Sequence, residues 1–339
     1  MKRIVFLVVF LLSIFTGKAQ SAFFDKGLDA FEKENYKQAI ALYTEQLKNK
    51  AGANVHFNRA LAYYAIQDYT SAIEDFTVVV TKDPLDYEAW YNRGLAHFYH
   101  GDMAQAIEDS EHALKLNPKY DNALTTLGMC AYKTEKYAEA LLIFDTILQI
   151  KESALSYYNR ALTFNKLGQI AAAEKDFTAA INLEPTERYY WGRADFYYNQ
   201  KNYQKSIDDY TLALALDTNS AELYYNRALS YYAGFKDKKA IKDLEQVLKM
   251  DSNDIDAKWY LCATYYAQED YEKALFYYNQ VETQNSNYGL LKDISKVELD
   301  RKTQLQDKLV YLILLVFFGV LALVFAFRLF RKVKKGKAE

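Results

Sequence analysis

Arginine recurs at a regular spacing in this chain of 339 residues, and in four places it follows an asparagine. A guanidinium group is well suited to hold a carboxylate, because its planar fork donates two parallel hydrogen bonds. That carboxylate could belong to a bound ligand or to the protein itself. The repeated pairs are Asn58-Arg59, Asn92-Arg93, Asn159-Arg160 and Asn226-Arg227, and Arg193 occupies the same place in a fifth segment.

An aspartate follows each of these arginines at one constant separation, which favours an internal partner. Where the arginine is missing from the equivalent position, the aspartate is missing too, and Leu42, Ile143 or Tyr277 stands in its place. Pairing between neighbouring segments fails this test, because Arg59 and Arg160 would then face Leu42 and Ile143. We therefore predict semi-buried structural ion pairs within single segments: Arg59–Asp75, Arg93–Asp109, Arg160–Asp176, Arg193–Asp209 and Arg227–Asp243.

The other side chains that could do chemistry do not converge in the sequence. His97 and His100 share a helix face and His112 lies in the next helix, but a metal site needs three or four converging ligands and no carboxylate or thiol is spaced to join them. Cys130 and Cys262 are expected to be separate buried thiols. No Gly-rich phosphate loop, HExxH, GxSxG or CxxC motif occurs. We predict no enzymatic activity, no cofactor and no metal.

A period of 33 or 34 residues positions all of these side chains. Pro84, Pro118 and Pro185 mark the same place in the period, which we count as position 32. Each unit contains two amphipathic segments with a polar turn between them, and small residues at positions 8 and 20 allow the two predicted helices to approach closely. The predicted repeats are 20–52, 53–86, 87–120, 121–153, 154–186, 187–220, 221–254 and 255–288.

With these landmarks the chain resembles the tetratricopeptide repeat family over residues 20–288. The resemblance implies an all-α fold, a right-handed α-solenoid of about eight helix-turn-helix repeats whose first helices line a concave groove. The chain departs from the family pattern at position 7, where five repeats have Arg in place of Leu. Chaperone-binding members hold a C-terminal carboxylate with Asn, Lys and Arg at groove positions. Such a clamp is the alternative to the structural ion pairs, although position 7 is expected to point inward.

The groove predicted from the resemblance is lined by two rows of aromatic rings at positions 5 and 12. Such rings are favoured at interfaces, but in this family they also serve packing. Charges near the groove are few and mixed in sign, and they include Asp195 and Glu222. The candidate partner-binding residues are Phe57, Tyr64, Tyr91, Phe98, Tyr132, Tyr158, Trp191, Tyr198, Tyr225, Tyr232, Trp259 and Tyr266.

The two ends of the chain differ from the repeats in composition. Residues 1–19 have a basic start followed by an apolar run, which predicts a cleaved signal peptide, with an uncleaved anchor as the alternative. Residues 309–327 contain no charge and are predicted to cross a lipid bilayer as one transmembrane helix, and residues 328–339 form a basic tail. Residues 289–308 are predicted to be a helix that caps the solenoid and continues into this span.

These features together predict a single-pass membrane protein with a cytoplasmic C-terminus and an extracytoplasmic ectodomain, periplasmic in a bacterial inner membrane. The ectodomain is net acidic and is not expected to bind nucleic acid. The predicted function is a non-enzymatic scaffold that binds a protein or peptide partner in its groove. The alternative is a sensor or receptor for a ligand or a cell-wall glycan that acts through a membrane partner.

Overall fold

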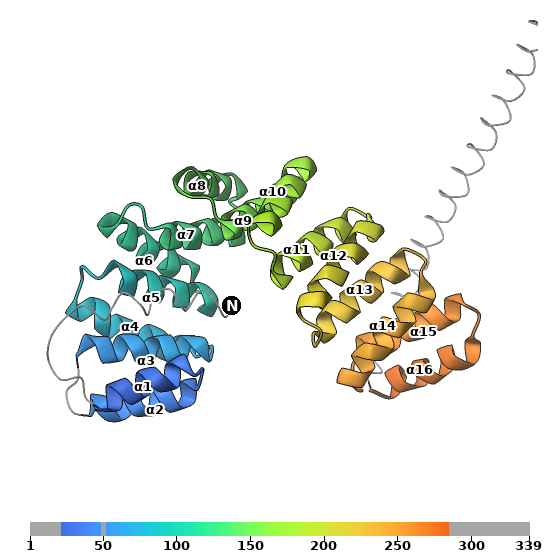
Figure 1. Ribbon diagram of the computed structural model, residues 1–339, viewed down its shortest axis with the longest axis horizontal. Coiled ribbons are helices and arrows are strands. Elements are labelled where there is room, and N and C mark those ends of the chain that lie inside the picture. Colours follow the sequence, from blue (N-terminus) through green and yellow to red (C-terminus); the bar gives the residue numbers. More distant parts are fainter. Residues whose placement is uncertain (1–21, 49–51, 285–339) are drawn as a thin grey trace, which may run out of the picture. The chain divides into compact units, whose positions relative to one another are not determined.

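The computed structural model describes residues 22–48 and 52–284, and every regular element within them is an α-helix (Figure 1). The predicted signal peptide (1–19), capping helix (289–308), membrane span (309–327) and tail (328–339) lie outside the described residues. Among the helices of the described part, none is long and apolar enough to cross a membrane. The described chain is therefore an all-α array of the kind expected for the repeats.

Each of the eight predicted repeats contains one helical hairpin, and consecutive hairpins pack against each other within residues 22–184 and, separately, within residues 185–284. The first helices of the hairpins are α1 (Ala22–Glu32), α3 (Ala53–Ala65), α5 (Tyr87–His100), α7 (Asp121–Lys133), α9 (Ala154–Lys166), α11 (Glu187–Asn199), α13 (Ala221–Ala233) and α15 (Ile255–Ala267). The second helices are α2 (Tyr36–Leu47), α4 (Tyr69–Lys82), α6 (Met103–Leu116), α8 (Tyr137–Ile150), α10 (Ile170–Leu183), α12 (Tyr203–Leu216), α14 (Asp237–Met250) and α16 (Tyr271–Gln284).

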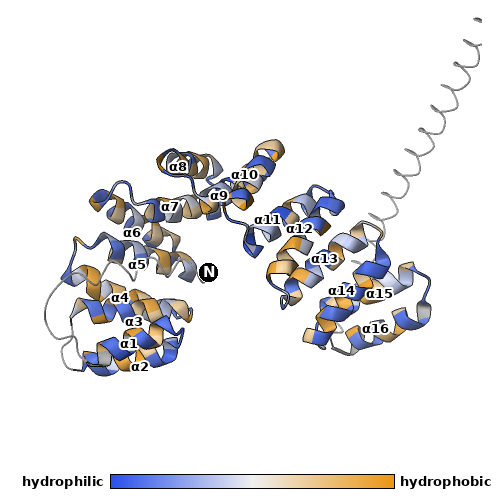
Figure 2. Ribbon diagram, in the orientation of Figure 1, coloured by the Kyte–Doolittle hydropathy of each residue, from blue (hydrophilic) through white to orange (hydrophobic). Residues whose placement is uncertain are grey.

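The chain forms two compact units that divide between Glu184 and Pro185. We call them the N-terminal unit, which contains α1 to α10, and the C-terminal unit, which contains α11 to α16. In both units hydrophobic and hydrophilic residues alternate along each helix, as expected for helices that bury one face (Figure 2).

Every hairpin turn has a left-handed residue at position 15, two residues before the second helix begins. Gly101 and Gly168 adopt this conformation without a Cβ penalty, whereas the other six turns hold a larger residue in it. The residue that follows is the N-cap of the second helix, and Asn35, Asp68 and Asn202 each accept a hydrogen bond there from a backbone N–H. The turn residues are Glu34, Gln67, Gly101, Glu135, Gly168, Lys201, Phe235 and Glu269.

Small residues allow the two helices of a hairpin to pack around a large side chain at position 24. Phe144, at this position on α8, is fully buried, and its ring occupies the space that a Cβ on Gly128 of α7 would need, at 2.6 Å. Gly27 and Tyr43 have the same relation in the first hairpin. Five of the large residues at position 24 are buried to 2% exposure or less: Tyr43, Phe76, Phe144, Phe177 and Tyr210.

Candidate functional site

The five arginines at position 7 each contact the aspartate predicted for them, on the second helix of the same hairpin. Each guanidinium makes two parallel hydrogen bonds, with Nε to Oδ2 distances of 2.6 to 2.8 Å and Nη2 to Oδ1 distances of 2.7 to 3.0 Å. The aspartates are only 3 to 4% exposed. The pairs are Arg59–Asp75, Arg93–Asp109, Arg160–Asp176, Arg193–Asp209 and Arg227–Asp243.

Four of these guanidinium groups, those of Arg59, Arg93, Arg160 and Arg227, also donate a hydrogen bond to the preceding hairpin, which the sequence pattern did not predict. Nη1 of Arg93 donates to the Thr77 hydroxyl at 3.3 Å, and Nη1 of Arg160 donates to the Asp145 carboxylate at 2.6 Å. These acceptors occupy position 25 of the preceding repeat. The sequence does contain a signal for these contacts. Position 25 is Thr or Asp in every repeat that precedes a repeat with the arginine, and it is Glu in the repeats that precede the fourth and eighth repeats, which lack the arginine. The residues at this position before an arginine are Thr44, Thr77, Asp145, Thr178 and Thr211.

In Arg59, Arg93, Arg160 and Arg227, Nε, Nη2 and Nη1 all donate to groups of the protein itself, so these guanidinium groups are already engaged without a ligand carboxylate. The hydrogen bonds to Asp75 raise the pKa of Arg59, although burial opposes them. The guanidinium of Arg93 also lies over the Trp90 ring, with Cζ 4.7 Å from its centroid. Asn58 and Asn92 donate to carbonyl groups of their own helices. The geometry therefore argues against the carboxylate clamp.

His97 and His100 do share a carboxylate, contrary to the sequence expectation that none was spaced to join them. Asp102 Oδ2 lies 3.3 Å from His97 Nδ1 and 2.8 Å from His100 Nδ1. Gly101, with a φ of 104°, turns the chain so that Asp102 faces the end of the helix. The hydrogen bonds with the two histidines lower the pKa of Asp102. Within the described residues no group of three His, Cys, Asp or Glu is arranged to hold a metal ion.

The aromatic rings predicted to line the groove are less exposed to a binding partner than expected. Five of them are buried, because position 5 or position 12 packs against the neighbouring helix. Phe57, for example, packs edge-on against Phe76 with ring centroids 5.5 Å apart. Tyr266 is exposed, and Tyr64, Tyr132, Tyr158, Trp191, Tyr198 and Tyr225 are half-buried. The buried rings, which we withdraw as contact residues, are Phe57, Tyr91, Phe98, Tyr232 and Trp259.

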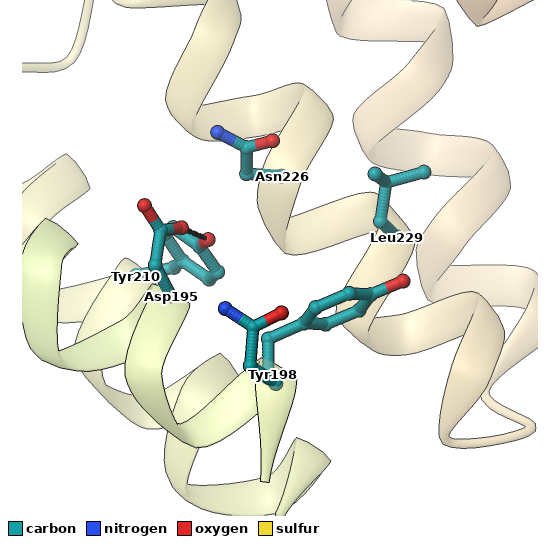
Figure 3. A pocket seen from close by; sticks show the side chains of 6 residues that line it. Asp195, Tyr198, Tyr210, Asn226 and Leu229 are labelled. Atoms are coloured by element: carbon teal, nitrogen blue, oxygen red, sulfur yellow. Dashed lines mark hydrogen bonds between the residues drawn. The ribbon is translucent and has the colours of Figure 1, made fainter. Parts of the chain in front are cut away.

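A small cavity lies on the first-helix side of the C-terminal unit, and we call it the Asp195 cavity (Figure 3). Asp195 and Tyr198 of α11 face Asn226 and Leu229 of α13, and Tyr210 of α12 lies beside Asp195. The Tyr210 hydroxyl donates a hydrogen bond to Asp195 Oδ1. The cavity has a volume of about 160 Å³, and Asn199 completes its lining. Two adjacent repeats thus combine a carboxylate, an amide and an aromatic ring at one place.

Asp195 differs from its equivalents, since position 9 is Leu in five of the other repeats. Burial raises the pKa of Asp195, and hydrogen bonds from Tyr210 and Trp191 oppose that shift. Glu222 adds to the rise, because it places a second negative charge nearby. Burial, followed by the charge of Asp195, also raises the pKa of Tyr210, so this hydroxyl remains a donor at neutral pH. Burial and the nearby Glu222 thus both disfavour the charged form of the Asp195 carboxylate.

Asp195→Asn is expected to remove a pH-dependent loss of stability. Because the pKa of Asp195 is raised on folding, the folded state is penalised as pH rises from about 4 through the raised value, and the penalty is absent below the unfolded pKa. The free energy of unfolding of the original chain, relative to the variant, should therefore fall over that range and then level off. Urea denaturation at a series of pH values measures this difference. A constant difference, or one of opposite slope, would contradict the expectation.

Comparison with known proteins identifies the family. Three family profiles described as tetratricopeptide repeat match the chain, at residues 87–120, at 24–86 together with 158–221, and at 221–254. Together they cover more than half of it. The chain belongs to the tetratricopeptide repeat family. The repeat prediction made from the sequence is thereby confirmed.

Several relatives share this repeat. Tetratricopeptide repeat protein 6 of Homo sapiens is 32% identical over 60% of this chain and 41% of the relative. The Hsp70-Hsp90 organizing protein of Triticum aestivum is 30% identical over 32% of this chain and 19% of the relative. This tetratricopeptide repeat protein therefore spans less than half the length of these relatives. The crystal structure of a tetratricopeptide repeat protein from Parabacteroides merdae aligns with a TM-score of 0.57 at 19% identity, over 75% of this chain and 97% of that one, and shows a shared fold.

The predicted localisation is wrong. We expected a single-pass membrane protein with an extracytoplasmic ectodomain and a cytoplasmic C-terminus. The relatives described above are not named as membrane proteins. The helices of residues 22–48 and 52–284 include none able to span a bilayer, since those of the hairpins have 11 to 14 residues against the roughly 20 required.

Proposed function

We propose that this tetratricopeptide repeat protein is a non-enzymatic scaffold that binds a protein or peptide partner along the first helices of its hairpins. The observation that carries this proposal is the Asp195 cavity, which opens between the first helices of two adjacent repeats. A site shared by two repeats exists only when the array is folded, as is typical of repeat proteins that bind partners on a stacked surface.

The residues around this cavity have the properties of an interaction surface. Tyr198 and Trp191 are half-buried, so each offers part of a large ring to a partner while packing holds it in place. Asn199 is exposed at the rim. The Hsp70-Hsp90 organizing protein, one of the relatives, takes its name from protein partners. Protein binding is therefore the activity that this surface supports best.

Site-specific photo-crosslinking in cells tests the proposal. A p-benzoylphenylalanine group at Asn199 is expected to give a discrete crosslinked protein, because Asn199 lies at the cavity rim. The same group at Leu212 provides the control, since this residue is 46% exposed but lies on the second helix of the same hairpin. Equal crosslinking from both positions, or none from Asn199, would contradict a partner site on the first helices.

The alternative of a glycan sensor has less support. Stacking on sugars requires exposed ring faces, and five of the twelve rings expected to provide them are buried in packing contacts.

A further inference from the structure

We propose that the Asp195 cavity binds the cationic side chain of a lysine or arginine presented by an extended segment of a protein partner. This inference rests on the proposed scaffold function and names the chemistry of the residue recognised. The cavity is lined by Asp195, Tyr198, Asn199, Tyr210, Asn226 and Leu229, which lie on three consecutive helices of the C-terminal unit.

Charge complementarity is the first reason. In the described part of the chain, the groups that hydrogen-bond to Asp195 are the neutral Tyr210 hydroxyl and Trp191 indole, and the charge that acts on it, Glu222, is also negative. A carboxylate can accept about four hydrogen bonds, so Asp195 keeps acceptor capacity beyond these two. A cation placed in the cavity would neutralise a half-buried charge that the protein itself leaves uncompensated.

The shape and lining of the cavity are the second reason. Small-molecule sites usually measure about 300 to 1,000 Å³, so a cavity of about 160 Å³ is sized for one side chain. Figure 3 shows the Tyr198 ring and Leu229 beside the polar group of Asp195 and Asn226. The ring and the leucine provide an apolar wall for a methylene stem, and the carboxylate and the amide oxygen provide acceptors for its charged end.

A purely structural role for Asp195 explains less. Its carboxylate satisfies the buried Tyr210 hydroxyl, but Tyr43, at the same position of the first hairpin, has a buried hydroxyl that finds no partner in the described structure. The fold therefore accepts a tyrosine at position 24 without such a partner. Leu28 stands at position 9 of that repeat, so an apolar residue is compatible with the packing. Neither the Tyr210 hydroxyl nor the packing at position 9 therefore requires a charged side chain at Asp195.

Titration of the full chain with Nα-acetyl-lysine N-methylamide tests the inference. With the asparagine side chains labelled for NMR, the amide resonances of Asn199 and Asn226 should shift saturably with this probe and not with its norleucine analogue. Asp195→Asn retains an acceptor for Tyr210 but loses the charge, and should weaken binding roughly tenfold to a hundredfold. Asp208→Asn, which removes an exposed charge from α12, should leave binding unchanged.

Two outcomes overturn the inference: equal shifts with the lysine and norleucine probes, or lysine binding that survives Asp195→Asn. Tyr210→Phe separates a structural role from a binding role, because it removes the hydroxyl and keeps the carboxylate, and should retain the lysine preference. Failure of the two proposals is distinguishable. A chain that crosslinks a partner through Asn199 but does not bind the lysine probe refutes only the cation site. A chain that binds the probe and crosslinks nothing keeps the cation site but refutes the scaffold, and with it a protein partner as the source of the cation.

Discussion

Replacing Asp109 by alanine is expected to lower the free energy of unfolding by about 3 to 5 kcal/mol, because the change strands a half-buried guanidinium. Arg93 makes two hydrogen bonds to this carboxylate, at 2.8 and 2.7 Å, and its side chain is only 17% exposed. Its remaining contacts, the Thr77 hydroxyl and the Trp90 ring, are neutral. Urea denaturation followed by circular dichroism measures the loss.

The matched control is the double variant Arg93→Leu with Asp109→Ile. It removes both charges and reproduces the residues of the fourth repeat, where Leu127 and Ile143 occupy the same two positions. Replacing a buried ion pair by apolar residues of similar size is often neutral or stabilising, so the double variant should be clearly more stable than Asp109→Ala. If both variants lost the same stability, the pair would not be a buried ionic contact.

Arg93 is a better position for this test than two of the other arginines. Arg160 has a second carboxylate, Asp145, which would continue to compensate its charge after Asp176→Ala. Asp75 pairs with His56 as well as with Arg59, at 2.7 Å for each contact. A change at either site would therefore mix two interactions, and the measured loss at Asp176 should be smaller than at Asp109.

Replacing Phe144 by alanine is expected to cost about 3 to 5 kcal/mol, because it opens a cavity at the centre of a hairpin. The Phe144 ring is completely buried and packs into the space left by the missing side chain of Gly128. Thermal and urea denaturation measure the effect. A loss of this size would show that the Phe144 ring holds α7 and α8 together.

Two further variants define the origin of that loss. Leu142→Ala removes a side chain of similar size from the same helix, but Leu142 is 69% exposed, so little change is expected. Gly128→Ala alone should destabilise by about 1 to 3 kcal/mol through overpacking. Combined with Phe144→Ala, the added methyl group fills part of the cavity, so the double variant should be more stable than the sum of the single losses implies. Additive losses would contradict direct packing of the ring on Gly128.

The sequence predicted the candidate site less well than the fold. Positions 5 and 12 of the repeat indicated which face the rings occupy, but not how deeply each ring is buried. Trp259 and Trp191 stand at the same position, yet Trp259 is 5% exposed and Trp191 is half-buried. The difference arises from packing against neighbouring helices, which a repeat pattern does not describe. Asp195 was visible in the sequence as a charge near the groove, but not as part of a cavity.

The sequence by itself determined the helical repeat, the hairpin in each unit and the pairing of arginine with aspartate, because each of these depends on residue types at fixed short separations. The arginine at position 7 faces the aspartate at position 23 in each of the five hairpins that has both residues. Only the tertiary structure decided which groups remain open to a partner. That depends on contacts between neighbouring hairpins. Asp195 and Asn226, for example, line the same cavity from two hairpins, and Arg160 donates a hydrogen bond to Asp145 of the preceding hairpin. Burial and uncompensated charge are properties of the stacked array, so no single repeat contains them.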